Sequence, residues 1–315
     1  MASLIEPGAM PELPEVETVC RQLEPELEGR RIESLEVLDP RWCRPAPASE
    51  LEATASGRTI ERLGRRGKYL LLGLDGGQTL VMHLRMTGNL VLVEGEDKLD
   101  PSEGMRLYEG ERSTSERHLR ARFALDDGRE IWFTDPRRFG EALLLDDDQL
   151  DAHFASRLGV EPLSADFTPG ALGEMAAGRT APLKSFLLDQ KGVAGVGNIY
   201  ADEALFRAQL HPLSPAGSMK PEHLEALRDA VVAALEAGID GGGASIDDYR
   251  DGRGEKGRMQ DEFLVHTREG KPCPRCDGTV ERIVVSGRST YFCPGCQVRL
   301  RRRPRRRRRP ARRSP

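Results

Sequence analysis

The chain has 315 residues, 38% hydrophobic and 31% charged, which favours a protein of two or three domains with real cores. No apolar run approaches the roughly 20 residues of a membrane span, and residues 1–9 lack the basic start and apolar stretch of a secretion signal. We therefore expect a cytoplasmic protein without membrane contact. The formal net charge is −4, but residues 299–315 hold 11 arginines and no acid, which leaves −15 for residues 1–298. Phosphate contacts act locally, so this overall charge neither indicates nor excludes DNA binding.

The first half of the chain is expected to form one helix and then a β-sandwich or barrel. Val16, Val19 and Leu23 recur at helical spacing, and Pro25 and Gly29 are expected to end that helix. Many short strand-like segments without interleaved helices indicate a sandwich or barrel. These segments are 32–38, 59–63, 68–74, 79–84, 90–93, 121–125, 130–134 and 141–145. The polar residues 94–117 are expected to form a long surface loop.

The pattern becomes helical near residue 146. The expected helices are 147–155, 169–177, 183–188, 199–208 and 221–238. A polar, glycine-rich stretch then runs from residue 241 to about residue 261, and a cysteine-containing module occupies residues 263–298. The arginine-proline tail, 299–315, is expected to be disordered because its like charges repel, and to raise non-specific DNA affinity.

Four of the six cysteines form two C-x-x-C pairs separated by 16 residues: Cys273 with Cys276, and Cys293 with Cys296. Each pair offers two thiolates from one tight turn, and two such turns close a tetrahedral metal site. In a reducing cytoplasm this spacing indicates a metal site more than disulfides. Because all four ligands are protein thiolates, we expect one structural Zn²⁺ with no position for a catalytic water.

The segment Met10–Thr18, MPELPEVET, has the character of a translation start. Removal of Met10 would leave Pro11 as the amino terminus, and a terminal proline is a secondary amine that can attack a carbonyl-like carbon and form an iminium. Glu12 lies beside it as a proton donor or acceptor. The structural alternative is that Pro11 and Pro14 only open a helix, with acidic residues at its positive end.

This segment resembles the amino terminus of the formamidopyrimidine-DNA glycosylases, enzymes that remove oxidised purines from DNA, and the resemblance extends to about residue 298. It implies an α+β multidomain fold. A helix and a β-sandwich would occupy residues 10–145, a helix–two-turn–helix domain with a lesion-recognition loop 146–262, and a zinc-ribbon hairpin 263–298. Residues 1–9 depart from the family pattern. While they remain attached, Pro11 has no free amine, so we expect translation to begin at Met10 or this segment to be removed.

Three further segments match family motifs. Arg288 begins the run RSTYFC, whose arginine in the family contacts phosphate and assists the last elimination step. In the run 190–200, QKGVAGVGNIY, the family's asparagine, here Asn198, holds the phosphate beside the lesion. Lys68, at the start of a strand, takes a place in the active site by the same resemblance. The residues alone allow plainer interpretations. Arg288 could be an ordinary exposed arginine, and Lys68 could be a solvated residue at a strand end. The glycines of the run 190–200 also weakly match a dinucleotide-binding loop.

Two turns suit an enzyme that extrudes a base from the duplex. Such an enzyme must fill the gap with an apolar wedge and bond the orphaned partner base. By resemblance, Met86 and Phe139 form the wedge and Arg137 contacts the estranged base, often cytosine. His118 matches a phosphate-binding histidine of the family, although the sequence alone equally allows a surface histidine. The remaining candidates for phosphate contact are Arg179 and Lys184.

Together these features predict a bifunctional DNA glycosylase/AP lyase of the bacterial nucleoid. It would bind damaged double-stranded DNA as a monomer and cleave the abasic site by β,δ-elimination through a Schiff base on Pro11, without a redox or nucleotide cofactor. Two alternatives stand beside this prediction: an endonuclease VIII-like glycosylase for oxidised pyrimidines, and a non-catalytic damaged-DNA-binding protein if residues 1–9 are retained. The PELPE start and the run from Asp135 to Gly140 favour the purine enzyme.

Overall fold

Helix α1 (Leu13–Leu27) leads into two antiparallel four-stranded sheets that form a β-sandwich. The structure is a computed structural model and describes residues 10–93, 116–246 and 248–301. One sheet has the strand order β1-β6-β7-β5 and the other β2-β3-β4-β8. The strands are β1 (Ile32–Val37), β2 (Ile60–Arg66), β3 (Tyr69–Leu74), β4 (Gln78–His83), β5 (Asn89–Val93), β6 (Leu119–Leu125), β7 (Glu130–Thr134) and β8 (Glu141–Asp146).

The sandwich forms because alternate residues of these strands are apolar and face one shared core. Trp42 lies at its centre, with ring centroids 6.3 Å from Phe123 and 5.1 Å from Phe133. A short helix, α2 (Ala48–Ala55), packs on β1 and was not expected from the sequence. The eight expected strands are confirmed, whereas most of the expected loop 94–117 lies outside the described residues.

The expectation that Pro25 ends the first helix is wrong, because α1 continues through Pro25 to Leu27. A proline in the last turn removes only one intrahelical donor. The backbone N–H of Glu28 still donates to the carbonyl of Glu24 at 3.0 Å, so the turn around Pro25 closes without it.

The five expected helices of the second half are all present. They are α3 (Asp147–Ala155), α4 (Pro169–Ala176), α5 (Leu183–Leu188), α6 (Asn198–Arg207) and α7 (Pro221–Asp240), with 3₁₀ segments η3 (Glu116–His118), η4 (Ala216–Ser218) and η5 (Met259–Glu262). The two strands of the C-terminal hairpin, β9 (Glu281–Val285) and β10 (Arg288–Phe292), pair antiparallel, and β10 packs on α6. None of the helices in the described ranges combines the length and hydrophobicity needed to cross a bilayer.

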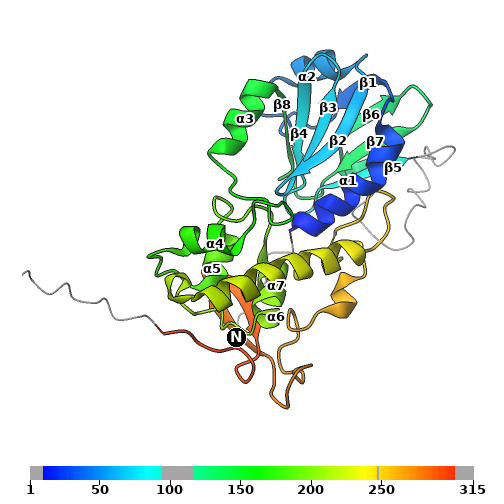
Figure 1. Cartoon of the computed structure of the whole chain (residues 1–315). Coiled ribbons are helices and arrows are strands. Elements are labelled where there is room, and N and C mark those ends of the chain that lie inside the picture. The colour runs from blue at the N-terminus through cyan, green and yellow to red at the C-terminus, as the bar shows by residue number, and fades with distance from the viewer. Residues whose placement is uncertain (1–9, 94–115, 247, 302–315) are drawn as a thin grey trace, which may run out of the picture.

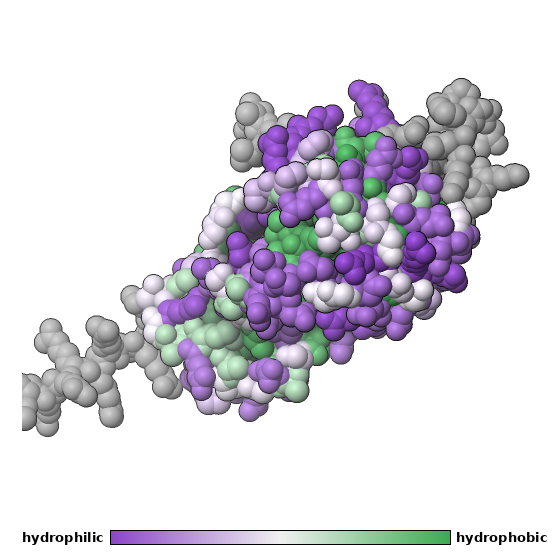
Figure 2. Space-filling view, turned by 90° about the horizontal axis from the view of Figure 1, so that it is seen from above, coloured by the Kyte–Doolittle hydropathy of each residue, from purple (hydrophilic) through white to green (hydrophobic). Residues whose placement is uncertain are grey.

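Helix α1 lies at the junction of the sandwich and the helical domain, next to α7 (Figure 1). Seen from above the sandwich, most of the surface is hydrophilic, and hydrophobic side chains are confined to smaller patches (Figure 2).

The glycine-rich stretch after α7 crosses back to the sandwich. The backbone N–H of Leu92 in β5 donates to the carbonyl of Gly252 at 3.1 Å, and the N–H of Arg250 donates to the side-chain carbonyl of Asn89 at 2.7 Å. The ring of Tyr249 is part of the sandwich core. This stretch therefore ties the helical domain to the sandwich, in addition to the direct linker.

The linker between the domains is held by Glu161. Its carboxylate accepts from Arg65 at 2.8 Å, from Arg66 at 2.7 Å and from the backbone N–H of Gly67 at 2.5 Å. The Arg65 side chain is only 9% exposed, so this ion pair is largely removed from water. Because Lys68 follows directly in the chain, the same contact fixes the backbone that carries it.

We predict that Glu161→Ala lowers the free energy of unfolding by about 3 kcal/mol, since it leaves two partly buried guanidinium groups short of a partner. Urea unfolding followed by circular dichroism measures the change. The matched control is Glu36→Ala, which breaks an exposed pair with Arg122 and should cost less than about 1 kcal/mol. Equal losses for the two variants would contradict the prediction.

Candidate active site

Pro11 and Glu12 precede α1 and lie against the helical domain. Pro11 is buried and Glu12 is 3% exposed. The Glu12 carboxylate accepts from the backbone N–H of Ile199 at 2.9 Å and from that of Tyr200 at 3.4 Å, at the amino-terminal end of α6. The positive end of a helix stabilises a carboxylate at this position. Residues from the two halves of the chain thus meet at Glu12, directly after the predicted nucleophile, Pro11.

Glu15 lies one turn further along α1, and the sequence had indicated only a role at the helix end. It accepts from the backbone N–H of Glu12 at 2.8 Å, from the Tyr200 hydroxyl at 2.7 Å and from the N–H of Ala244 at 2.8 Å. Burial raises the pKa of Glu15 to about 7, and the nearby Glu12 adds to the rise. Its carboxylate therefore fixes the backbone of Glu12 while carrying a proton near neutral pH part of the time.

Lys68 is 6% exposed and follows Gly67, whose φ of +58° turns the chain into β3. Burial lowers the pKa of Lys68; Glu12 opposes this change and the Arg288 guanidinium adds to it. Arg288 is exposed at the start of β10. The structure therefore brings Lys68 and Arg288 into the electrostatic surroundings of Glu12.

His83 was not singled out by sequence analysis. It is 6% exposed, and burial, reinforced by Arg85 and Lys68, lowers its pKa to about 3. Its Nδ1 accepts from the backbone N–H of Arg85 at 2.9 Å. The ring is consequently neutral at physiological pH, and the sequence did not distinguish this histidine from the buried apolar residues that precede it in β4.

Asn198 begins α6, and its side-chain amide donates to the carbonyl of Ser289 at 3.0 Å. This bond joins the helical domain to the hairpin strand that begins with Arg288. The Asn198 side-chain oxygen is buried and has no hydrogen-bond partner among the described residues. The turn expected between α5 and α6 is therefore present. At its end, the side-chain oxygen of Asn198 is a buried acceptor without a donor among the described residues.

The structure argues against the expected direct phosphate contact of Lys184. Its side chain is fully buried, and its ammonium donates to Asp202 and to the carbonyl of Asn198, both at 2.6 Å. Asp202 also contacts His266 at 2.9 Å. A buried cation needs such partners, so Lys184 is an internal tie beneath Asn198.

The other expected DNA-binding residues are at least partly accessible. Phe139 is 52% exposed, and the guanidinium of Arg137 lies 5.0 Å from the centre of its ring. Met86 is half-buried in the turn after β4. Burial and the neighbouring Arg120 and Arg117 lower the pKa of His118. Arg179, which pairs with Asp189 at 2.9 Å, completes this set.

The four module cysteines converge, with all Sγ atoms within 4.8 Å of one another. Cys273 Sγ lies 3.7 Å from Cys296 Sγ, and Cys276 Sγ lies 3.6 Å from Cys293 Sγ. A tetrahedral zinc with Zn–S bonds of about 2.3 Å requires sulfur–sulfur separations of about 3.8 Å. The residues therefore fit one structural Zn²⁺, as the sequence predicted.

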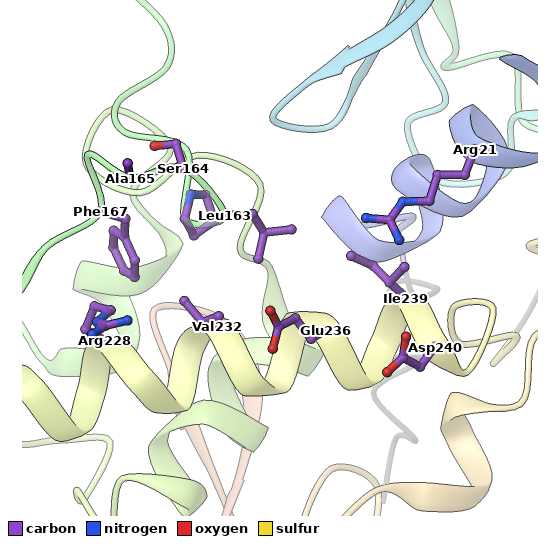
Figure 3. A pocket seen from close by; sticks show the side chains of 11 residues that line it. Arg21, Leu163, Ser164, Ala165, Phe167, Arg228, Val232, Glu236, Ile239 and Asp240 are labelled. Atoms are coloured by element: carbon purple, nitrogen blue, oxygen red, sulfur yellow. The ribbon is translucent and has the colours of Figure 1, made fainter.

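A separate cavity of about 630 Å³ lies where α1, the linker and α7 meet (Figure 3). Its walls combine apolar side chains, such as Phe167 and Val232, with charged ones, such as Glu236. None of the predicted catalytic, DNA-binding or metal-binding residues lines it. The chemistry assembled around Glu12 is thus outside this cavity.

Three family models cover most of the chain. The formamidopyrimidine-DNA glycosylase N-terminal domain matches residues 10–142, the H2TH domain of the same enzymes matches 158–250, and the zinc finger found in FPG and IleRS matches 270–298.

Curated relatives and solved structures give the same result. The chain is 49% identical to a formamidopyrimidine-DNA glycosylase of Chloroflexus aurantiacus, over 92% of this chain and 99% of the relative. A homologue of the same name from Azorhizobium caulinodans is 46% identical, over 91% of this chain and all of the relative. The Lactococcus lactis Fpg in complex with DNA containing an abasic site superposes with a TM-score of 0.79 at 34% identity, over 91% of this chain and 99% of that one.

We predict that Glu15 makes stability fall as pH rises. Because its folded pKa is raised from 4.5 to about 7, its stabilising contribution is complete below pH 4.5 and is lost as pH rises through about 7. The loss is on the order of 3 kcal/mol. Glu15→Gln cannot ionise, so the wild-type free energy of unfolding should decline relative to this variant between pH 4.5 and 8.

Glu17→Gln is the contrasting control for this pH series. Burial alone would raise the pKa of Glu17, but hydrogen bonds from Arg65 and Arg21 lower it overall. Its contribution is therefore present above its unfolded pKa and is lost in acid. A difference between wild type and Glu15→Gln that stays constant with pH would contradict the assignment.

We also predict that Cys276→Ser abolishes stoichiometric zinc binding and loosens the β9–β10 hairpin, since the metal holds this small module together. Metal analysis should find about one zinc per wild-type chain and almost none in the variant. Proteolysis after residue 270 should accelerate. Cys20→Ser, a buried thiol outside the module, is the control that should keep its zinc.

Proposed function

The chain belongs to the formamidopyrimidine-DNA glycosylase family, and we propose that it performs this family's chemistry through an amine on Pro11. Base-excision repair of oxidised purines is its function. The observation that supports the mechanism is the contact of Glu12, which follows Pro11 in the chain, with the amino-terminal end of α6.

The proposed reaction begins when the damaged nucleotide is rotated out of the duplex. The Pro11 nitrogen attacks the sugar C1′ and displaces the oxidised base, which leaves with a proton. The C1′–O4′ bond then opens, O4′ takes a proton, and an iminium joins the enzyme to the ring-opened sugar. Elimination then breaks the C3′–O bond and afterwards the C5′–O bond, and hydrolysis releases Pro11. The strand is left nicked on both sides of the missing nucleoside.

Glu12 is the proposed proton carrier for the departing base and the opening sugar. Two backbone donors at the start of α6 fix its carboxylate, and Glu15 holds its backbone. A proton carrier must lie within hydrogen-bond reach of its target. These contacts fix the Glu12 carboxylate close to Pro11, its neighbour in the chain. Loss of the base and opening of the sugar would both occur there.

Lys68 and Arg288 are proposed to support proton handling and to neutralise phosphate. A lysine whose pKa is lowered by burial releases a proton more readily than an exposed one. Asn198 is proposed to hold the phosphate beside the lesion through its side-chain NH2 group, which carries two N–H donors and lies at the start of α6. Arg179 and His118 are proposed as further phosphate contacts.

Met86, Arg137 and Phe139 are proposed to replace the extruded nucleotide, with Arg137 on the estranged base. An exposed aromatic ring paired with a guanidinium suits this task, because it can stack on bases that lose a neighbour. We propose double-stranded damaged DNA as the partner, a monomeric state and a location in the cytoplasm on the bacterial nucleoid. For the arginine-rich tail, whose residues 302–315 lie outside the described ranges, we propose a contribution to non-specific DNA affinity.

The first test is borohydride trapping on a duplex with one 8-oxoguanine opposite cytosine. Protein begun at Met10 and protein begun at Met1 are compared, and both intact masses are checked. We expect a covalent adduct when Pro11 is the amino terminus and none when residues 1–9 remain attached, because the amide nitrogen is not a nucleophile. Begun at Met10, Glu12→Gln should trap far less.

Absence of adduct from both forms, with DNA binding kept, would sink the enzymatic proposal and support the non-catalytic alternative. A lesion panel separates the other alternative: faster excision of oxidised pyrimidines than of 8-oxoguanine would place the chain with the endonuclease VIII-like enzymes.

A further inference from the structure

Asp135 lies between the two turns that carry the proposed wedge. It is 1% exposed and directly follows β7. One carboxylate oxygen accepts from the Thr87 hydroxyl and, at 3.1 Å, from the backbone N–H of Arg137; the other accepts from the N–H of Gly140 at 2.6 Å. One side chain therefore closes the turn of Arg137 and Phe139 and also reaches the neighbouring turn.

Thr87 is the contact on the other side. It is 4% exposed and follows Met86 in the chain. Its hydroxyl donates to Asp135, and the same oxygen accepts from the backbone N–H of Arg137 at 3.2 Å. Thr87 thus uses both the donor and the acceptor capacity of its hydroxyl to join the Met86 turn to the Arg137 turn.

These contacts continue the sheet beyond its last strand pair. The β5–β7 ladder ends with Asn89 opposite Thr134. Beyond this pair the two strands continue into turns and no longer pair through their backbones. The hydrogen bond between the side chains of Thr87 and Asp135 joins the two segments there. This hydrogen bond and the one from the Arg137 N–H to the Thr87 hydroxyl join the two turns to each other. The carbonyls of Thr87 and Asp135 also accept from Asn89 in β5 and Arg120 in β6.

Both turns are closed so tightly that only glycine fits. A Cβ at Gly88 would lie 2.4 Å from the carbonyl oxygen of Leu84, and a Cβ at Gly140 would lie 2.6 Å from the ring of Phe133. Each turn is therefore closely packed, one against its own backbone and the other against the ring of Phe133.

We propose that Thr87 and Asp135 are positioning residues for base extrusion: their hydrogen bond sets the Met86 turn against the Arg137–Phe139 turn. Neither side chain is exposed enough to contact a base, so both act through the residues that they hold. This inference rests on the proposed function, because it assigns the two turns to filling the gap in the duplex.

The test separates positioning from general damage by using two substrates. A duplex with 8-oxoguanine opposite cytosine requires expulsion of a paired base, whereas a duplex with a preformed abasic site has no base to expel. Under single-turnover conditions, Thr87→Val should slow excision from the first by about tenfold, the net value of one hydrogen bond to a charged group. Trapping on the second should remain within about twofold of wild type.

Thr134→Val is the matched control. Thr134 is fully buried next to Asp135, and its hydroxyl has no hydrogen-bond partner among the described residues. The change therefore removes the same group from the same neighbourhood without breaking the bond between the turns. Both of its rates should stay within about twofold of wild type. Thr87→Ser keeps the hydroxyl and should restore excision.

A double-mutant cycle tests whether Thr87 acts through Met86. In a Met86→Ala background only the Phe139 part of the wedge remains, so Thr87→Val should slow excision by clearly less than tenfold further. A full tenfold loss in that background, or a Thr87→Ser variant as slow as Thr87→Val, would overturn the inference. So would equal losses on both substrates. Wild-type protein that neither excises nor traps would instead refute the proposed function itself.

Discussion

The Glu12 carboxylate rests on the first backbone N–H groups of α6, and this contact joins the start of the sandwich domain to the helical domain. It requires close approach of two backbones. A Cβ at Gly197 would lie 2.2 Å from Glu12 Cδ, and one at Gly195 would lie 2.6 Å from the side chain of Leu13. The glycines of this turn are therefore needed for the packing of α1, in addition to any contact with phosphate. The position of Pro11 follows from that packing.

Several ionisable side chains lie around this contact and are buried, so water does not solvate their charges. Glu15 and Lys68 are both almost fully buried. Burial raises the pKa of Glu15 and lowers the pKa of Lys68, so it favours the neutral form of each side chain. Lys184 keeps its charge partner, Asp202, in direct contact. A site that must exchange protons benefits from ionisable groups whose pKa is shifted by burial and neighbouring charges. The cost in stability is offset by apolar cores on both sides and by the zinc module, whose metal takes no part in the chemistry.

The local sequence pattern was sufficient to predict most helices and strands. It was insufficient where tertiary contacts determine whether an element forms or a side chain is buried. Strands with alternating apolar residues and the C-x-x-C spacing were predictable, because each signal lies within a short segment. Helix α2 carries little apolar periodicity and forms by packing on β1. Pro25 shows that a breaker in a final turn need not end a helix. The burial of Lys184 depends on Asp202, 18 residues away, and could not be inferred from either residue alone.

The residues proposed for the site differ in burial. Of those proposed for bond making, Glu12 and Lys68 are buried, whereas Arg288 is exposed. Those assigned to the duplex, such as Phe139, are exposed and project from tight turns. An exposed apolar side chain costs little when its backbone is fixed by buried polar contacts beneath it. Family resemblance can identify the exposed groups, but the buried threonine and aspartate that hold them become evident only when two turns, about 50 residues apart in sequence, are seen in contact.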